Sequence, residues 1–192
     1  FHNAISNIRS AVKVTYPWQA ESSKTKKTKD SDFPVFIIYE NKNLSLNSDY
    51  YYESDCVQFE KYYNIANSAS QTPQEKTEAA VKAVELYKGE FMPGYYEPWC
   101  EELRENYLNM YQKLCESLIK LYYETDDYQN IIKYSDKLLE SDKLHPEAYL
   151  RIIESHVKLN NFNTARGKFA LMLKNYDEEL GEKPEKPVLD KI

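Results

Sequence analysis

Glycine, cysteine and histidine are all scarce in this chain, which has 192 residues but only four glycines, three cysteines and three histidines. All four glycines follow residue 88, so a dinucleotide-binding Gly-x-Gly-x-x-Gly loop cannot be written anywhere in the sequence. The stretch Gly89-Glu-Phe-Met-Pro-Gly94 has the glycine spacing of a phosphate-binding loop. However, Tyr95 and Tyr96 stand where such a loop needs Lys followed by Ser or Thr. A nucleotide-binding enzyme is therefore excluded.

The few cysteines and histidines argue against disulfide and metal frameworks. Cys56, Cys100 and Cys115 are odd in number and lack a Cys-x-x-Cys spacing. Cys100 and Cys115 occur in strongly helical sequence, where a cysteine is usually a buried free thiol. Cysteines without disulfides also fit a protein from a reducing compartment. His145 and His156 have no Cys or carboxylate at a metal-ligand spacing that recurs. We therefore expect no catalytic residue, no metal and no cofactor, and we predict that the chain is not an enzyme.

Long hydrophobic runs are also missing. The longest apolar run, Val35–Tyr39, is far too short to span a bilayer, and the opening Phe1-His-Asn-Ala is not the basic start of a signal peptide. These observations predict a cytoplasmic protein without membrane contact. The lack of an initiating Met predicts that the chain is part of something longer.

The charge is unevenly distributed. Of a net charge of −6, residues 1–32 contribute six basic and three acidic side chains, a balance of +3, which leaves −9 for the remainder. Residues 1–32 form a basic head on an otherwise acidic chain, so only this head is predicted to contact a polyanion. The alternative is that the lysine-rich stretch of the head is merely a solvated loop.

Residues 1–47 are predicted to form a helix, a loop and a β-hairpin. Residues 2–14 place an apolar stripe on one side of a helix, and Tyr16-Pro17 ends it. Residues 19–32 are polar and read as a loop, and residues 33–47 have the β-branched, turn and alternating pattern of a hairpin. The other face of the helix is either solvated or suited to nucleic-acid contact, because it carries short or forked hydrogen-bonding groups: Asn3, Ser6, Asn7, Arg9, Ser10 and Lys13.

The chain is predicted to be helical after Asp49. One helix is expected over about 55–68, and Thr72-Pro-Gln-Glu75 is a strong capping signal for the next, which stops at Gly89. A long helix begins at Pro98-Trp99. Among the glycines, we expect positive φ at Gly89 and Gly94 in the linker, a helix end at Gly181, and close helix packing at Gly167. The many tyrosines of this acidic part are interpreted as helix-to-helix packing groups rather than base-stacking groups.

The last third of the chain repeats itself at an offset of 34 residues. Tyr128 aligns with Phe162 and Leu138 with Met172. A 34-residue period with two helices per unit is the tetratricopeptide signature, in which an aromatic after a polar turn wedges between helices. The helix from Pro98 must then stack on the first clear repeat, because each unit needs a neighbour. An unrelated helical bundle is the alternative.

Several motifs carry a resemblance to a known family: Leu86–Trp99, Glu102-Leu-Arg104, the Asp127-Tyr128 turn and Glu179-Leu-Gly181. In this order they resemble the bacterial transcriptional activator domain, the tetratricopeptide-like half of the Streptomyces antibiotic regulatory protein family. The resemblance covers residues 50–192. It implies a mainly α fold, a helical repeat array preceded over residues 1–49 by the C-terminal part of a response-regulator-type winged helix.

The resemblance also implies a function, that of a transcriptional regulator. Residues 1–14 are similar to a recognition helix and residues 33–47 to the wing, so the intact protein would bind double-stranded promoter DNA. The implied contacts are Asn3, Ser6, Asn7 and Ser10 at base edges, with Arg9, Lys13 and Lys42 at phosphates. The helical domain would bind RNA polymerase or another regulatory protein, or associate with itself as a homodimer.

A rival interpretation is a scaffold or ligand-sensing repeat module without DNA binding. Its groove would bind a peptide or a small molecule through the first helix of each unit. Tyr122, Arg151 and Ser155 are the residues predicted to face that groove.

Overall fold

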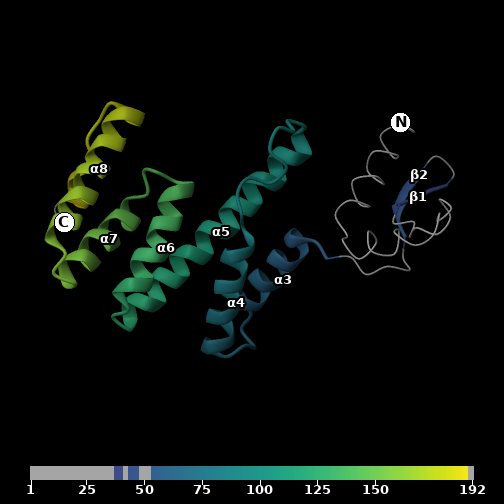
Figure 1. Ribbon diagram of the computed structural model, residues 1–192, viewed down its shortest axis with the longest axis horizontal. Helices are drawn as coiled ribbons and strands as arrows, with labels where there is room; N and C mark the ends of the chain where they lie inside the picture. Colours follow the sequence, from purple (N-terminus) through teal and green to yellow (C-terminus); the bar gives the residue numbers. More distant parts are fainter. Residues whose placement is uncertain (1–36, 41–42, 48–52, 190–192) are drawn as a thin grey trace, which may run out of the picture. The chain divides into compact units, whose positions relative to one another are not determined.

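The computed structural model describes residues 37–40, 43–47 and 53–189 (Figure 1). The chain divides into two compact units, residues 1–53 and 54–192. In the first unit, strands β1 (Ile37–Glu40) and β2 (Asn43–Leu46) pair antiparallel, with Ile37 opposite Leu46. This pairing lies within the stretch predicted as a hairpin. Its identity as a wing stays a prediction, and the predicted helix over residues 2–14 lies outside the described residues.

The regular secondary structure in the described part of the second unit is all helical, which confirms the mainly α prediction. Consecutive helices from α3 to α8 contact one another, and the short α9 contacts α7. The helices are α3 (Asp55–Asn67), α4 (Pro73–Leu86), α5 (Pro98–Glu124), α6 (Tyr128–Ser141), α7 (Pro146–Lys158), α8 (Phe162–Leu180) and α9 (Lys186–Leu189).

The start of α4 has the capping box that the sequence predicts. The Glu75 amide donates to the Thr72 hydroxyl at 3.3 Å, and the Thr72 amide donates to the Glu75 carboxylate at 2.8 Å. Pro73 occupies the first helical position, where an amide donor is not needed. The hydrogen bonds from the Thr72 amide and hydroxyl lower the pKa of Glu75. Local sequence alone therefore determines where this helix begins.

The 34-residue period is present in the helix boundaries. Helices α5 and α7 end 34 residues apart, at Glu124 and Lys158, and α6 and α8 begin 34 residues apart, at Tyr128 and Phe162. Two consecutive units therefore have the same helix–turn–helix layout. The stacking of α5 on α6 is also as predicted.

The turns between the paired helices match in backbone geometry. Asp126 and Asn160 occupy the same place in the repeat, and both have positive φ, 54° and 60°. The next amide in each turn donates to the carbonyl five residues earlier, Asp127 to Tyr122 at 3.0 Å and Asn161 to His156 at 2.8 Å. A bond of this kind is typical of a helix that ends with a residue in the left-handed conformation. The two turns therefore have the same C-terminal capping motif.

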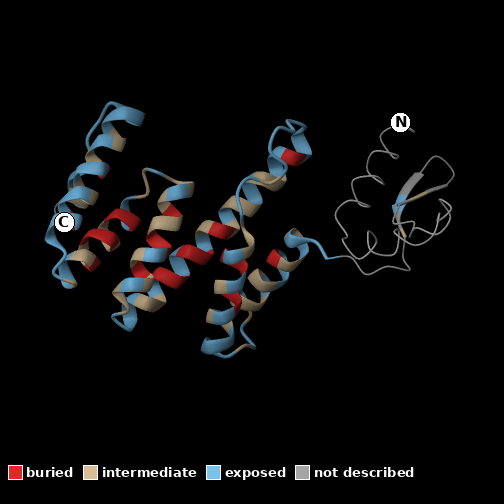
Figure 2. Ribbon diagram, viewed as in Figure 1, coloured by how far each residue is buried: buried red, intermediate tan, exposed pale blue. Residues whose placement is uncertain are grey.

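The core is concentrated in the middle of the array. Figure 2 shows buried residues on the facing sides of α4, α5, α6 and α7, whereas α8 is mostly intermediate or exposed. A large apolar cluster joins α3 to α7, with Leu114, Leu118, Ile131 and Leu138 among its most buried members. A smaller cluster contains Tyr149, Ile153, Ala165 and Met172.

The aromatic wedge prediction holds for only one of the two units. Tyr128 is half-buried against the large cluster, but Phe162 leaves 53% of its surface exposed. The physical reason is that α6 has α7 beyond it, whereas α8 is followed in the described part only by the four-residue α9. The expectation that Phe162 wedges between helices is therefore wrong.

Three of the four glycines have the conformations that were expected. Gly89, Gly94 and Gly181 have φ of 139°, 85° and 66°, and Gly181 ends α8 in the left-handed region. Gly167 is different, because no atom lies within 4 Å of the place where its Cβ would be. The prediction that Gly167 is needed for close packing is therefore wrong.

The tyrosines and thiols agree with the sequence interpretation. The buried ring of Tyr111 donates its hydroxyl to the Lys137 carbonyl at 3.4 Å, and Tyr176 donates to the Leu144 carbonyl at 2.8 Å. Cys100 and Cys115 are buried free thiols. Burial raises the pKa of Cys115 to about 12, so this thiol stays protonated.

Nowhere in the described ranges is a helix both long and apolar enough to cross a membrane.

Candidate protein-interaction groove

A groove of about 470 Å³ lies between α5 and α7. Its floor is apolar, because Ile119, Leu138 and Ala148 are buried there. Its rim is polar and carries charges of both signs: Glu116, Lys120, Tyr123, Glu124, His145, Glu147 and Arg151. An apolar floor with a polar rim is the usual composition of a surface that binds a peptide segment.

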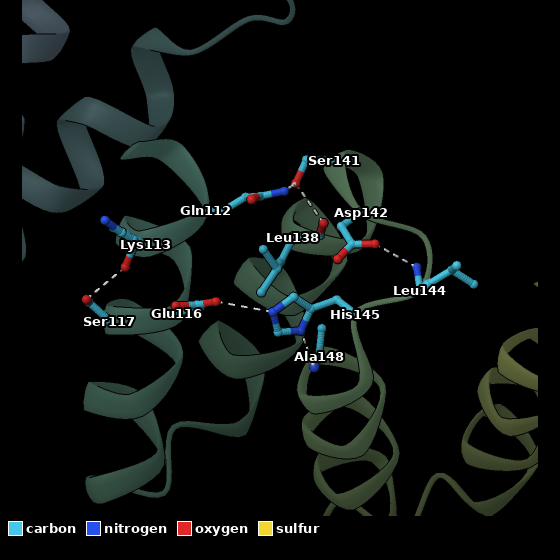
Figure 3. A network of polar contacts seen from close by, with 10 residues as sticks. All are labelled: Gln112, Lys113, Glu116, Ser117, Leu138, Ser141, Asp142, Leu144, His145 and Ala148. Atoms are coloured by element: carbon cyan, nitrogen blue, oxygen red, sulfur yellow. Dashed lines mark hydrogen bonds and ion pairs between the residues drawn. The ribbon is translucent and has the colours of Figure 1, made fainter. Parts of the chain in front are cut away.

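One end of the groove is formed by His145, which caps α7. Its Nδ1 accepts a hydrogen bond from the Ala148 amide at 3.2 Å, so the ring proton is assigned to Nε2. Nε2 lies 3.2 Å from Glu116 Oε1 and donates to it (Figure 3). The histidine thereby joins the start of α7 to the middle of α5. The Glu116 side chain remains 53% exposed and keeps acceptor capacity toward the groove.

The wall contributed by Arg151 and Tyr123 is held in place by several contacts. The guanidinium carbon of Arg151 lies 3.9 Å from the centre of the Tyr123 ring, a cation–π arrangement. The same guanidinium pairs with Glu147 at 2.7 Å and with Glu154 at 3.0 Å. The Tyr123 hydroxyl donates to Glu154 at 3.1 Å. Tyr123 is thus a fixed aromatic group that is still 40% exposed.

The environment of Arg151 keeps it charged. Partial burial by itself lowers the pKa of Arg151, but Glu147, Tyr123 and Glu154 together raise it above its ordinary value. The carboxylates therefore neutralise this cation locally, and Lys120 is the remaining cation on the rim. The wall formed by Arg151 and its carboxylate partners is therefore close to neutral in total charge. Lys120 and the acidic groups of the rim remain as separate charges beside it.

This arrangement is suited to binding. Within the part of the chain that the structure describes, no three or more His, Cys, Asp or Glu side chains are grouped so as to hold a metal ion. The histidine of the groove is used as a helix cap and hydrogen-bonds with Glu116 and the Ala148 amide. The groove supplies an aromatic anchor, an apolar floor and hydrogen-bonding groups, which are the elements of peptide recognition.

The residues that the sequence predicts as DNA contacts cannot be placed. All of them lie outside the described residues, so they stay predictions: Asn3, Ser6, Asn7, Arg9, Ser10, Lys13 and Lys42.

The residues predicted for a groove are partly corrected. Arg151 lines it, as expected. Ser155 is only 1% exposed, and Tyr122 is half-buried with its ring stacked on Tyr134 at 5.7 Å, so neither prediction holds. Tyr123, which sequence reasoning missed, takes the groove position instead. Adjacent tyrosines on a helix point about 100° apart, and the sequence did not distinguish which of the two faces the core.

The fold defines a class, that of helical repeat domains. The family model described as bacterial transcriptional activator domain matches residues 54–190, and the chain therefore belongs to this family. The family is a regulatory domain of transcriptional activators, as the sequence motifs implied. No curated protein sequence matches the chain.

Proposed function

We propose that the chain belongs to a transcriptional regulator of the Streptomyces antibiotic regulatory protein type. Residues 1–49 are the end of a winged helix, and residues 50–192 are the regulatory helical domain. The observation that carries the proposal is the match to the transcriptional activator family over residues 54–190. The basic balance of residues 1–32 supports a DNA-binding role for the segment that precedes it.

In the intact protein, the helix over residues 2–14 enters the major groove of promoter DNA. Asn3, Ser6, Asn7 and Ser10 are placed near base edges, where their short hydrogen-bonding groups read sequence. Arg9, Lys13 and Lys42 neutralise phosphates. Sequence specificity would then come from the four small polar residues, and affinity mainly from the three cations.

The helical domain connects promoter binding to transcription by binding a protein partner in the cytoplasm. The partner is RNA polymerase or another regulatory protein, and self-association as a homodimer is the second use of the domain. The groove between α5 and α7 supports this role, because Tyr123 is rigidly held and yet 40% exposed. Exposed aromatic anchors of this kind carry much of the binding energy in protein interfaces.

The DNA-binding part is tested by fluorescence anisotropy of the full-length protein with duplex DNA at several salt concentrations. Binding should weaken steeply with salt, and Arg9→Ala should lower the magnitude of the slope of log K against log salt by about one. Lys174→Ala is the matched control, since this lysine is 65% exposed on α8 and pairs only with Glu178. Absent or salt-insensitive binding would contradict the proposal.

The protein-binding part is tested by measuring the affinity of the full-length protein for purified RNA polymerase. Tyr123→Ala should weaken the complex about tenfold, as expected for an aromatic anchor. Phe162→Ala removes an aromatic outside the groove that is 53% exposed, against 40% for Tyr123, and as the control it should have no effect. If the full-length protein does not bind DNA, and a peptide or small molecule stabilises the chain against unfolding, the scaffold or ligand-sensing alternative is favoured instead.

A further inference from the structure

A second cavity, of about 460 Å³, lies away from the groove and is surrounded by aromatic rings. It is formed by the start of α3, the end of α4, the linker that follows, and Tyr107 of α5. Four of its lining side chains are aromatic: Phe59, Tyr87, Phe91 and Tyr107. The volume is within the range that holds small organic ligands.

The four rings are arranged around the cavity rather than stacked together. Phe59 is only 3% exposed and forms the base. Its centre lies 6.1 Å from that of Tyr87 at an interplanar angle of 48°, and 5.9 Å from that of Tyr107 at 74°. Phe91 lies 5.3 Å from Tyr107 at 46°. Tyr87 also stacks on Tyr111 at 4.2 Å, so the rings of Phe59, Phe91 and Tyr107 are the ones left to line this half-open cavity, and ring faces carry negative electrostatic potential.

The linker wall of this cavity is held by Arg104 of α5. Its guanidinium donates to the carbonyls of Phe91 at 3.2 Å, Met92 at 3.1 Å and Tyr95 at 2.8 Å. It also pairs with Glu90 at 2.6 Å and with Glu101 at 3.1 Å. Met92 has φ of 45°, an unfavourable conformation for a residue with a side chain, and these contacts maintain it. The wall is therefore formed before any ligand arrives.

Carboxylates dominate the electrostatics of the cavity. Asp55 and Glu90 line it, and the Tyr107 hydroxyl donates to Glu60 at 2.6 Å. Lys88 also lines the cavity, and Glu90 is paired with Arg104, so the negative charge of the surroundings comes mainly from Asp55 and Glu60. The surroundings are therefore rich in π faces and negative charge.

The titration of the lining groups agrees with this picture. Burial and then Glu60 raise the pKa of Tyr107, and burial and then Glu90 raise that of Tyr87. Burial and then Asp55 raise the pKa of Cys56.

We propose that this cavity binds a small organic cation, an ammonium group with apolar substituents. The ring faces of Phe91 and Tyr107 contact the substituents and the positive charge, and Asp55 supplies the counter-charge. Quaternary and substituted ammonium groups are the cations that aromatic cages recognise, because they are weakly hydrated and bind through cation–π contact. The site is independent of DNA binding and of the groove, so it stands or falls separately from the proposed function.

The ligand class is tested by calorimetric titration of the chain with choline and with its uncharged isostere 3,3-dimethylbutan-1-ol. The two differ in one atom, nitrogen against carbon, so the comparison isolates the charge. Choline should bind about tenfold more tightly than the alcohol, the ratio expected for a desolvated cation–π site. Equal affinities would overturn the proposal. So would a lack of saturable binding by both choline and benzyltrimethylammonium.

Variants test the location. Phe91→Leu keeps an apolar wall but removes a ring face, and should weaken choline binding about fivefold. Asp55→Asn keeps the shape and removes a charge, and should weaken choline binding without affecting the alcohol. Trp99→Leu is the control, because this ring is 52% exposed and does not line the cavity. Choline affinity that is the same in Phe91→Leu and Trp99→Leu, with both variants showing native melting curves, would overturn the assignment.

Discussion

Helices α6 and α8 are equivalent in the repeat but differ in their surroundings. Helix α6 lies between α5 and α7 and buries Ile131, Tyr134, Ser135 and Leu138. Helix α8 packs on α7 and buries only Ala165 and Met172. The turn before each helix is the same, with a left-handed residue and the same backbone closing bond, although only α6 has a side-chain hydrogen bond at its N-cap. The repeat thus determines the path of the chain, whereas the number of neighbours determines how much apolar surface each unit buries.

The difference has a consequence for stability. In a repeat protein, each unit is stabilised by its own packing and by the interface with its neighbours. Because α8 has one full-length neighbour and α6 has two, α8 should open more often than α6 in native-state hydrogen exchange.

The largest effect is expected from truncating the equivalent core residues Leu138 and Met172, both fully buried. Leu138→Ala leaves a cavity inside the large cluster and should lower the free energy of unfolding by about 3 kcal/mol. Met172→Ala should cost about 2 kcal/mol, because the smaller cluster can collapse more easily. Chemical denaturation measures both values. Hydrogen exchange should show that Met172→Ala accelerates exchange in α8 alone, and a uniform acceleration would contradict the comparison.

A smaller effect is expected from the two left-handed turn residues. Asp126→Ala and Asn160→Ala should each lower the free energy of unfolding by about 1 kcal/mol, because alanine tolerates positive φ less well than Asp or Asn. Asp126→Ala should be the more harmful of the two. The Asp126 carboxylate accepts a hydrogen bond from the Tyr128 hydroxyl at 2.7 Å, and the equivalent Phe162 has no hydroxyl. Tyr128→Phe should remove that difference in thermal melts.

The open space at Gly167 predicts a stabilising substitution in the weaker unit. Gly167→Ala should raise the free energy of unfolding by about 1 kcal/mol, because the position is helical and a Cβ meets nothing within 4 Å. Gly181→Ala is the control from the same helix and should destabilise, since Gly181 has φ of 66°. Differential scanning calorimetry of the two variants distinguishes them, and a shift of the same sign in both would contradict the interpretation.

The smallest effect concerns pH. His156 of α7 occupies the repeat position of Tyr122 in α5, and burial followed by the nearby charge of Lys168 lowers its pKa below 6.5. In the pH range between the folded and unfolded values, the unfolded chain binds a proton that the folded chain does not. Stability should therefore fall as the pH drops through the ordinary histidine pKa toward the lower value of the folded state. His156→Gln should flatten this part of the stability profile, and an unchanged slope would rule out His156 as its source.

Much of the helical part could be predicted because its signals are local. The capping box at Thr72, the turn before Tyr128 and the glycine at 181 each act through neighbouring residues, and all three hold in the structure. Burial was harder to predict, because it depends on which element lies beyond a residue. Phe162 and Gly167 were both assigned a packing role that their position in the last unit does not provide.

The linker shows a second limit of sequence reasoning. In the sequence, Arg104 is notable only as part of the Glu102-Leu-Arg104 motif, yet its side chain is only 15% exposed and binds three carbonyls of the linker. Contacts between a side chain and distant backbone carbonyls leave no pattern in the sequence, because every residue offers the same carbonyl. The cavity that this arginine shapes was for that reason not predicted.

Helix α5 runs without a break through both binding regions. It has 27 residues, and after Pro98 it contains neither glycine nor proline. Its first turns extend beyond α4 (Figure 1) and carry Arg104 and Tyr107 at the aromatic cavity, while its last turns carry Glu116 and Tyr123 in the groove. Such a helix is a rod of about 40 Å with no internal hinge. The cavity and the groove therefore share one stiff helix, which fixes how far apart their lining side chains on α5 lie.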